Sequence, residues 1–158
     1  MFKVGDRVVY PMHGAGVVES IEEREVLGQV HKYYVLRLSF GDMKVMVPVD
    51  SADEVGLRKV ISDAEVNAVL EVLKAECTAM SPNWNRRYRS NLEKIKSGSI
   101  YEVADVVRNL TMRDKEKGLS TGERKMLDSA KEILISELTL VKGWKREEAE
   151  TVLQQILA

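Results

Sequence analysis

The sequence predicts an α+β protein of two domains: a small SH3-like or Tudor-like antiparallel β-barrel over residues 1–58 and a compact all-α bundle of about five helices over residues 59–158. Three observations predict it. The first part alternates short β-rich runs with glycine turns, and the second repeats apolar residues at helical spacing behind capping residues. The pattern changes after Pro48, which places the domain border nearby.

The β-rich part contains four or five short apolar runs between Phe2 and Val49. Residues Leu36, Leu38 and Phe40 alternate with more polar neighbours, as in a strand with one buried face. Glycine-containing triplets between the runs are predicted to be turns: Gly14-Ala15-Gly16, Leu27-Gly28-Gln29 and Phe40-Gly41-Asp42. Because closure removes most exposed strand edges, so few strands favour a bent barrel over an open sandwich.

Capping signals divide the second part into helices. Ser62 with Glu65 and Ser120 with Glu123 have the spacing of capping boxes, in which the serine and the glutamate satisfy each other's backbone N–H groups. The expected helices run from Asp63 to about Ala75, from Trp84 to Ser97-Gly98, from Ile100 to near Gly118, from the Ser120 box to Gly143, and from Lys145 to Leu157. The last one either completes the bundle or mediates self-association.

The composition argues against catalysis and against a bound cofactor or metal. One cysteine, Cys77, and two distant histidines, His13 and His31, give no disulfide and no multi-cysteine zinc site. No nucleophile-elbow, Walker, dinucleotide or zinc-hydrolase motif occurs, and Gly14-Ala15-Gly16 lacks the glycine and lysine of a phosphate loop. With no signal-peptide pattern and no membrane-length apolar run, we expect a cytoplasmic monomer that is not an enzyme.

The charge is balanced overall but not locally. The chain has a formal net charge of −1, whereas the segment from Pro82 to Lys131 has twelve basic and seven acidic residues, a net charge of plus five. A local basic patch of this kind is typical of a nucleic-acid surface.

The stretch Pro82–Arg89 stands out within that segment. Asn83 is a suitable helix cap, so Trp84 falls in the first turn, with three arginines close behind it. Two interpretations are open. The ring could part a base step while the arginines contact phosphates, or it could anchor the helix to a core, which is the commoner arrangement for a tryptophan.

Three motifs in order along the chain resemble the CarD family. They are Phe2-Lys3-Val4-Gly5-Asp6-Arg7-Val8-Val9-Tyr10-Pro11 with His13-Gly14, then Asn83-Trp84-Asn85-Arg86-Arg87-Tyr88, then Gly118-Leu119-Ser120-Thr121-Gly122-Glu123. The N-terminal part also resembles the polymerase-interaction module of bacterial transcription-repair coupling factor. The resemblance implies a bacterial regulator without enzymatic activity, which binds the RNA polymerase β subunit through the first domain and promoter DNA through the second.

The resemblance also implies roles for individual residues of the second domain. Trp84 falls on the family's minor-groove wedge at the upstream edge of the transcription bubble, where an inserted ring favours the opened duplex and slows its collapse. Basic residues on matching positions are implied to contact the DNA backbone with weak sequence specificity: Arg86, Arg87, Arg89, Arg124 and Lys125. For Lys94 and Lys96, solvation of their helix is the preferred interpretation.

In the first domain the family arginine that contacts the polymerase falls on Arg24. A second arginine of some relatives is replaced by Met46, which can bury area but cannot form a charge-assisted pair. An exposed strand edge near Arg24 could extend a sheet of the polymerase. The alternative function is an RNA-binding or peptide-binding adaptor whose helical bundle is only a scaffold.

Overall fold

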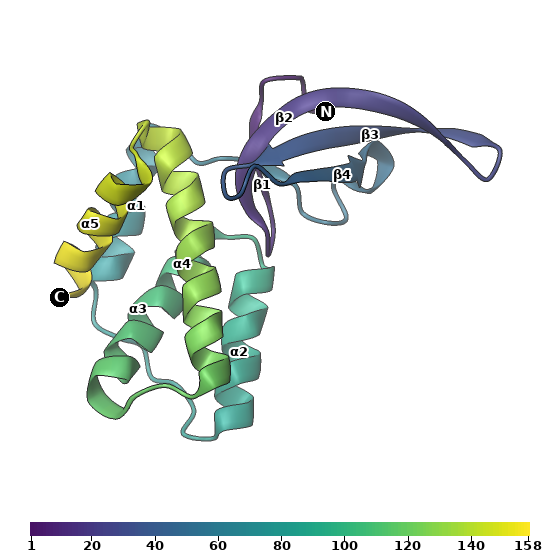
Figure 1. The fold of residues 1–158 in the computed structure, drawn as a ribbon. Coiled ribbons are helices and arrows are strands. Elements are labelled where there is room, and N and C mark those ends of the chain that lie inside the picture. The colour runs from purple at the N-terminus through teal and green to yellow at the C-terminus, as the bar shows by residue number, and fades with distance from the viewer.

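A computed structural model describes residues 1–158 as a curved antiparallel sheet beside a bundle of helices (Figure 1). The elements are β1 (Arg7–Tyr10), β2 (Gly14–Val26), β3 (Gln29–Leu38), β4 (Lys44–Pro48), the 3-10 turn η1 (Val49–Ser51), β5 (Arg58–Lys59), α1 (Asp63–Lys74), α2 (Trp84–Lys96), α3 (Ile100–Lys117), α4 (Thr121–Lys142) and α5 (Arg146–Leu157). The predicted α+β class, with a small antiparallel β part before five helices, is confirmed.

The sheet has the strand order β4-β3-β2-β1-β5, so β4 and β5 are its two edges. Strands β2 and β3 pair from Gly16 opposite Leu38 to Val26 opposite Gln29, with a bulge between Val18 and Ser20. This hairpin is longer than its neighbours and reaches away from the helices (Figure 1). The short β5 pairs with β1 across the expected domain border, so Arg58 and Lys59 belong to the sheet.

The prediction of a turn at Gly14-Ala15-Gly16 is wrong, because these residues begin β2 and the turn lies at residues 11–13. The two glycines instead allow atoms of other elements to approach the β2 backbone closely. A Cβ atom on Gly16 would lie 2.4 Å from the Arg37 carbonyl oxygen, and one on Gly14 would lie 2.8 Å from Ser136 Oγ of α4. Glycines at alternate positions of a strand can therefore mark places where atoms of another element approach the strand closely.

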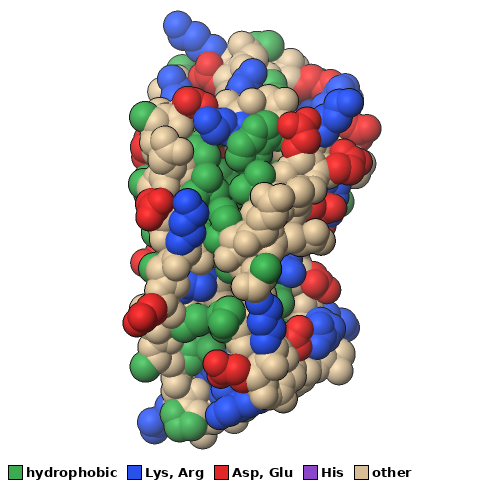
Figure 2. All heavy atoms as spheres, turned by 90° about the vertical axis from the view of Figure 1, so that its left-hand side faces the viewer, with side chains coloured by type: hydrophobic (Ala, Val, Ile, Leu, Met, Phe, Trp, Pro, Cys, Tyr) green, Lys and Arg blue, Asp and Glu red, His purple; other side chains and the backbone are tan.

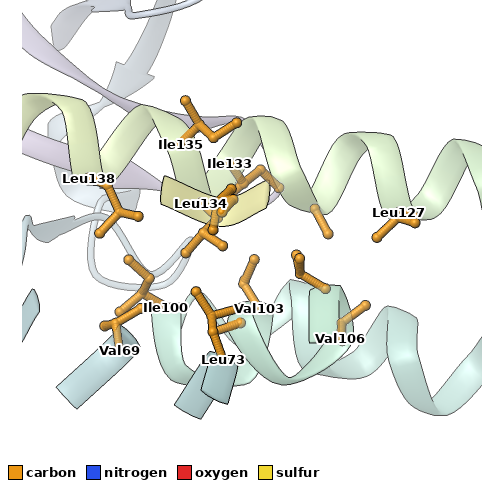
Figure 3. Packing of buried hydrophobic residues seen from close by; sticks show 14 of the residues in the cluster. Val69, Leu73, Ile100, Val103, Val106, Leu127, Ile133, Leu134, Ile135 and Leu138 are labelled. Atoms are coloured by element: carbon orange, nitrogen blue, oxygen red, sulfur yellow. The ribbon is translucent and has the colours of Figure 1, made fainter. Parts of the chain in front are cut away.

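The bundle is built around α3 and α4, whose apolar faces meet along their length. Figure 3 shows Leu134 and Leu138 of α4 above Ile100 and Val103 of α3, with Leu73 of α1 beside them. The last helix, α5, buries three residues on this core, Ala149, Leu153 and Leu157, and so completes the bundle. The helical-period prediction is confirmed in α4, where all apolar residues from Met126 to Leu138 are buried, whereas two of the three buried residues of α2 are polar, Arg87 and Asn91.

One of the two predicted capping boxes is complete. At α1 the Glu65 N–H donates to Ser62 Oγ over 3.3 Å, and the Ser62 N–H donates to Glu65 Oε1 over 3.2 Å. At α4 the Glu123 N–H donates to Ser120 Oγ over 3.1 Å, but the Glu123 carboxylate is turned to Arg87. The Ser120 box is therefore only half formed, and the prediction of a complete box is wrong. The Glu123 carboxylate binds the buried Arg87 and does not accept the Ser120 N–H.

Figure 2 shows the face that α1 and α5 form, where a band of hydrophobic side chains is surrounded by interspersed basic and acidic ones. A hollow of about 600 Å³ lies among α3, α4 and α5, and it is lined by three cations and three carboxylates, Lys115, Lys131, Arg146, Asp128, Glu132 and Glu150. Since the two signs balance here, this side of the bundle is not the basic surface that the sequence predicts. No helix combines the length and the apolar character that crossing a bilayer demands.

Candidate nucleic-acid interface

The stretch around Trp84 lies where two helices start side by side. Helix α2 begins at Trp84 behind its cap Asn83, whose Oδ1 accepts from the Arg86 N–H over 3.0 Å, as predicted. Helix α4 begins next to it, at the end of the bundle far from the sheet (Figure 1). Because each helix start carries a partial positive charge, two adjacent starts favour a nearby anion such as phosphate.

Trp84 is exposed and yet fixed in place. Its exposed fraction is 40%, and its indole Nε1–H donates to Ser120 Oγ over 2.9 Å. Its ring stacks on Tyr88 with 4.9 Å between centroids and 16° between planes. Gly122 leaves room for it, since a Cβ there would lie 3.4 Å from Trp84 Cζ2. The ring therefore lies across the start of α4, outside the buried core, and the core-anchor interpretation does not fit this position.

Arg87 does not fit the predicted phosphate contact, because its side chain is only 3% exposed. Its Nε donates to Glu123 Oε2 over 2.7 Å and its Nη2 to Glu123 Oε1 over 3.2 Å. Its Nη1 donates to the carbonyl oxygens of Ser81 and Pro82 over 3.2 and 3.3 Å. With its donors occupied inside the protein, Arg87 is a structural residue.

The Arg87–Glu123 pair joins the first turns of α2 and α4. The hydrogen bonds from Arg87 hold the pKa of the Glu123 carboxyl below its usual value, so the pair stays charged although both side chains are buried. Helical spacing could have revealed this buried pair. Arg87 lies three residues after Trp84 and four before Asn91, so it shares one side of α2 with them. Tyr88 and Ile95 lie on that side too. Because an arginine is rarely buried without a partner, an arginine on the buried side of a helix predicts a buried acidic residue nearby.

The other predicted cations are exposed around the two helix starts. Arg86 and Arg89 are three residues apart on the side of α2 that faces away from its buried stripe, and Lys125 follows Gly122 by three residues on α4, on the side nearer Trp84. None of the three takes part in an ion pair within the protein. They are free to pair with phosphates.

Arg124 is exposed but already paired. Its Nη2 donates to Asp114 Oδ1 at the end of α3 over 2.8 Å, and this hydrogen bond raises the pKa of the guanidinium. A phosphate would have to compete with Asp114 for it. Lys94 is half-buried and paired with Asp105 of α3, so it links two helices and does not simply solvate its own helix as expected.

The two residues expected to contact polymerase share one face of the sheet. Arg24 of β2 lies opposite His31 of β3, and Met46 of β4 lies opposite Val35 of β3. Since His31 and Val35 are four residues apart on one strand, both point to the same side, roughly 13 Å apart along it. The Arg24 side chain is 59% exposed and Met46 is 40% exposed, so both are accessible from that side.

Strand edges are also available near this face. Strand β4 is an edge of the sheet, and β1 pairs with β2 only as far as Val17. The outer part of β2, from Ser20 to Val26, therefore has β3 on one side and no strand on the other. Such edges can accept a strand of another protein.

Known proteins resemble both parts of the chain. Residues 2–61 match the family model described as the CarD-like/TRCF RID domain, and residues 68–154 match the model described as the CarD C-terminal domain. YdeB of Bacillus subtilis, described as a candidate transcription factor, is 44% identical over 144 residues, which cover 90% of this chain and 94% of that protein.

Two further proteins are similar to shorter parts. The transcription-repair-coupling factor of Staphylococcus haemolyticus is 30% identical over 129 residues, which are 82% of this chain and 10% of that protein. The solved N-terminal domain of Myxococcus xanthus CarD is 39% identical, with a TM-score of 0.33, and covers 37% of this chain and 79% of that one. With both domain models matched in order and a relative that aligns over nearly its full length, the chain belongs to the CarD family of transcription factors, which are not enzymes.

Proposed function

We propose that this protein binds the RNA polymerase β subunit through its sheet and promoter DNA through the starts of α2 and α4, and that Trp84 prolongs the open complex by wedging into the minor groove at the upstream edge of the bubble. The observation that supports this most directly is an exposed tryptophan held beside two helix starts. The Trp84 ring lies outside the buried core of the bundle, so core packing does not account for its position.

The geometry around Trp84 suits insertion between bases. Parting a base step costs a few kcal/mol, and a flat ring that fills the gap recovers part of that cost only if it is held in the right direction. The hydrogen bond to Ser120 and the stack on Tyr88 fix the ring before DNA arrives. Less side-chain freedom is then lost on binding.

The cations around the ring support phosphate contacts rather than base reading. Arg86, Arg89 and Lys125 are exposed beside the two helix starts, and the chain has no base-reading motif. We expect weak DNA binding by the protein alone, with steep salt dependence and little discrimination among duplex sequences. Tight binding to one sequence at physiological salt would argue for a base-reading surface instead.

The polymerase part of the proposal rests on the β domain. Residues 2–61 match the domain that CarD proteins share with transcription-repair coupling factor, and the positions Arg24 and Met46 share one accessible face. Methionine adds apolar area but no charge, so Arg24 carries the charge-assisted part of the contact.

The test is the lifetime of the open complex on a promoter with wild-type protein, with Trp84→Ala and with Lys96→Ala. Lys96 is an exposed residue at the far end of the same helix, so its variant controls for the truncation of a surface side chain of α2 away from the proposed wedge. We expect Trp84→Ala to bind polymerase normally and to shorten the lifetime strongly, and Lys96→Ala to behave as wild type. A Trp84→Ala protein that leaves the lifetime unchanged would overturn the wedge.

A further inference from the structure

We infer that Arg58, Ser136 and Glu137 form a rigid joint between the two domains, and that this joint sets where Trp84 lies relative to the polymerase-binding face. The inference deepens the proposed function and rests on it for its consequence. The joint itself is argued from contacts alone. Arg58 and Glu137 are positioning residues, since they touch neither of the proposed binding surfaces.

The centre of the joint is a buried carboxylate. Glu137 of α4 is 1% exposed and receives two hydrogen bonds from Arg58 of β5, over 2.7 and 2.8 Å. It also accepts the backbone N–H of Ile61 over 2.9 Å. Ile61 lies in the three-residue connection between β5 and α1, so the same carboxylate fixes both the strand and the connection.

A second contact prevents rotation about this centre. Ser136, the residue before Glu137, accepts the Ala15 N–H of β2 over 2.8 Å and donates to the Ile133 carbonyl oxygen. Successive residues of a helix point about 100° apart, because there are about 3.6 residues in a turn. The sheet therefore holds α4 from two directions, which fixes its orientation as well as its position.

The side chains around the joint leave little room for sliding. Gly14 is required next to Ser136, because a Cβ there would lie 2.8 Å from Ser136 Oγ. Pro11 of the β1–β2 turn fits against Gly98, where a Cβ would lie 2.9 Å from Pro11 Cγ. Farther along, the Arg146 guanidinium of α5 lies 4.4 Å from the centre of the Phe40 ring, in the connection between β3 and β4.

Helix α2 connects the joint to the wedge. Arg58 Nε donates to the Gly98 carbonyl oxygen over 2.8 Å, directly after the end of α2, and Trp84 is the first residue of the same helix. Figure 1 shows α2 running from the sheet to the far end of the bundle. Its 13 residues span about 20 Å, so a small tilt at the joint would displace the ring by several ångströms.

Hydrogen exchange on the full-length protein tests the joint, because the Ala15 and Ile61 amides both donate across it. In the wild type we expect both amides to be protected. In Glu137→Gln the exchange of Ile61 and Ala15 should rise by about tenfold or more, while the Val107 amide inside α3 keeps its protection. The matched control is Glu71→Gln, which removes an exposed carboxylate paired with Lys74 on α1 and should change neither amide.

The same variants test the consequence. We expect Glu137→Gln to bind polymerase and free DNA as the wild type does, but to shorten the open-complex lifetime severalfold, because the two surfaces are no longer held in register. Should Glu137→Gln fail to fold, Ser136→Ala serves in its place, because it removes the acceptor of the Ala15 N–H and otherwise only a hydrogen bond within α4, to the Ile133 carbonyl oxygen.

Two results would overturn the inference. One is rapid exchange of Ala15 and Ile61 in the wild type, which would mean that the joint is open in solution. The other is an unchanged lifetime in a variant whose two amides have lost protection. Failure of the proposed function is distinguishable, because it would appear as an unchanged lifetime with Trp84→Ala, whatever the exchange shows.

Discussion

The two exposed residues most central to the proposed function, Trp84 and Arg24, are held by the fold in opposite ways. Trp84 has a hydrogen bond to Ser120, a stacking partner in Tyr88, and a buried ion pair one turn behind it. Arg24 lies on the outer part of a two-stranded hairpin, where its ion pair is with the neighbouring Glu22, over 3.1 Å between exposed side chains.

The difference agrees with the roles proposed for the two residues. A wedge between stacked bases would need a support that keeps its direction under load. A charged side chain on a hairpin only has to reach an opposite charge, and an adaptable side chain does so at little cost to stability. The more rigid of the two residues is thus the one proposed to distort its partner, and the variants below test that contrast.

The largest effect is expected from Arg87→Ala. It leaves the Glu123 carboxylate buried without its partner, which costs about 3–5 kcal/mol in the free energy of unfolding. Arg24→Ala is the matched control and should change stability by less than about 0.5 kcal/mol. Urea denaturation measures both, and equal losses would remove the contrast between the two regions.

A double variant sharpens this result. Replacing the pair together, as Arg87→Met with Glu123→Leu, removes both charges and should cost less than Arg87→Ala alone. If the double variant is the less stable of the two, the pair contributes more than the avoidance of an unpaired charge.

Acid should weaken the same pair. The pKa of Glu123 is lowered in the folded protein by its hydrogen bonds with Arg87, so the pair's stabilisation is fully present above the unfolded value of about 4.3 and is lost as the pH falls through the lower folded pKa. The difference in unfolding free energy between wild type and Glu123→Gln should therefore shrink below about pH 4. A difference that stays constant from neutral pH to pH 3 would contradict this assignment.

A smaller loss is expected from Trp84→Ala. The variant loses a stacking contact and one hydrogen bond at an exposed site, together about 1–2 kcal/mol. A tryptophan in the core would cost about 3–5 kcal/mol instead. Thermal melting of the same preparation used for open-complex lifetimes distinguishes the two, and a loss in the upper range would place the ring in the core.

The smallest effect on stability is expected from Arg24→Glu, within about 0.5 kcal/mol. Its effect should appear in polymerase pull-down, which falls because the charge that meets the polymerase is reversed. Lys32→Glu is the control, since Lys32 lies opposite Glu23 and points to the other face of the same hairpin. Equal pull-down by the two variants would show that this face is not the contact surface.

Local patterns determined much of the fold. The five helices and most of their ends follow from apolar spacing and capping residues such as Ser62 and Asn83, because these act within a few residues of chain. The β character of the first part follows in the same way. Local chemistry also singled out Trp84, since a tryptophan in a first turn among arginines is unusual wherever the chain goes.

Long-range contacts decided the rest. Arg87 was predicted to contact phosphate and is instead buried against Glu123, 36 residues away. Gly14 and Gly16 were predicted to turn and instead make room for Ser136 and Arg37. In each case the deciding partner is remote in sequence, and a residue's type and spacing cannot tell which remote group will desolvate it or press against it.

The joint between the domains shows the same limit most clearly. Arg58, Ser136 and Glu137 are ordinary polar residues in the sequence, and nothing near them indicates a partner. Folding brings them together in a site where an unpaired charge would be costly, so each one specifies the other only after the sheet and α4 have met. The sequence by itself determined which elements form and which residues are chemically unusual. The tertiary structure alone decided which charged side chains are paired inside the protein and which stay free for a partner. The reason is that the burial of a residue depends on which distant parts of the chain pack against it.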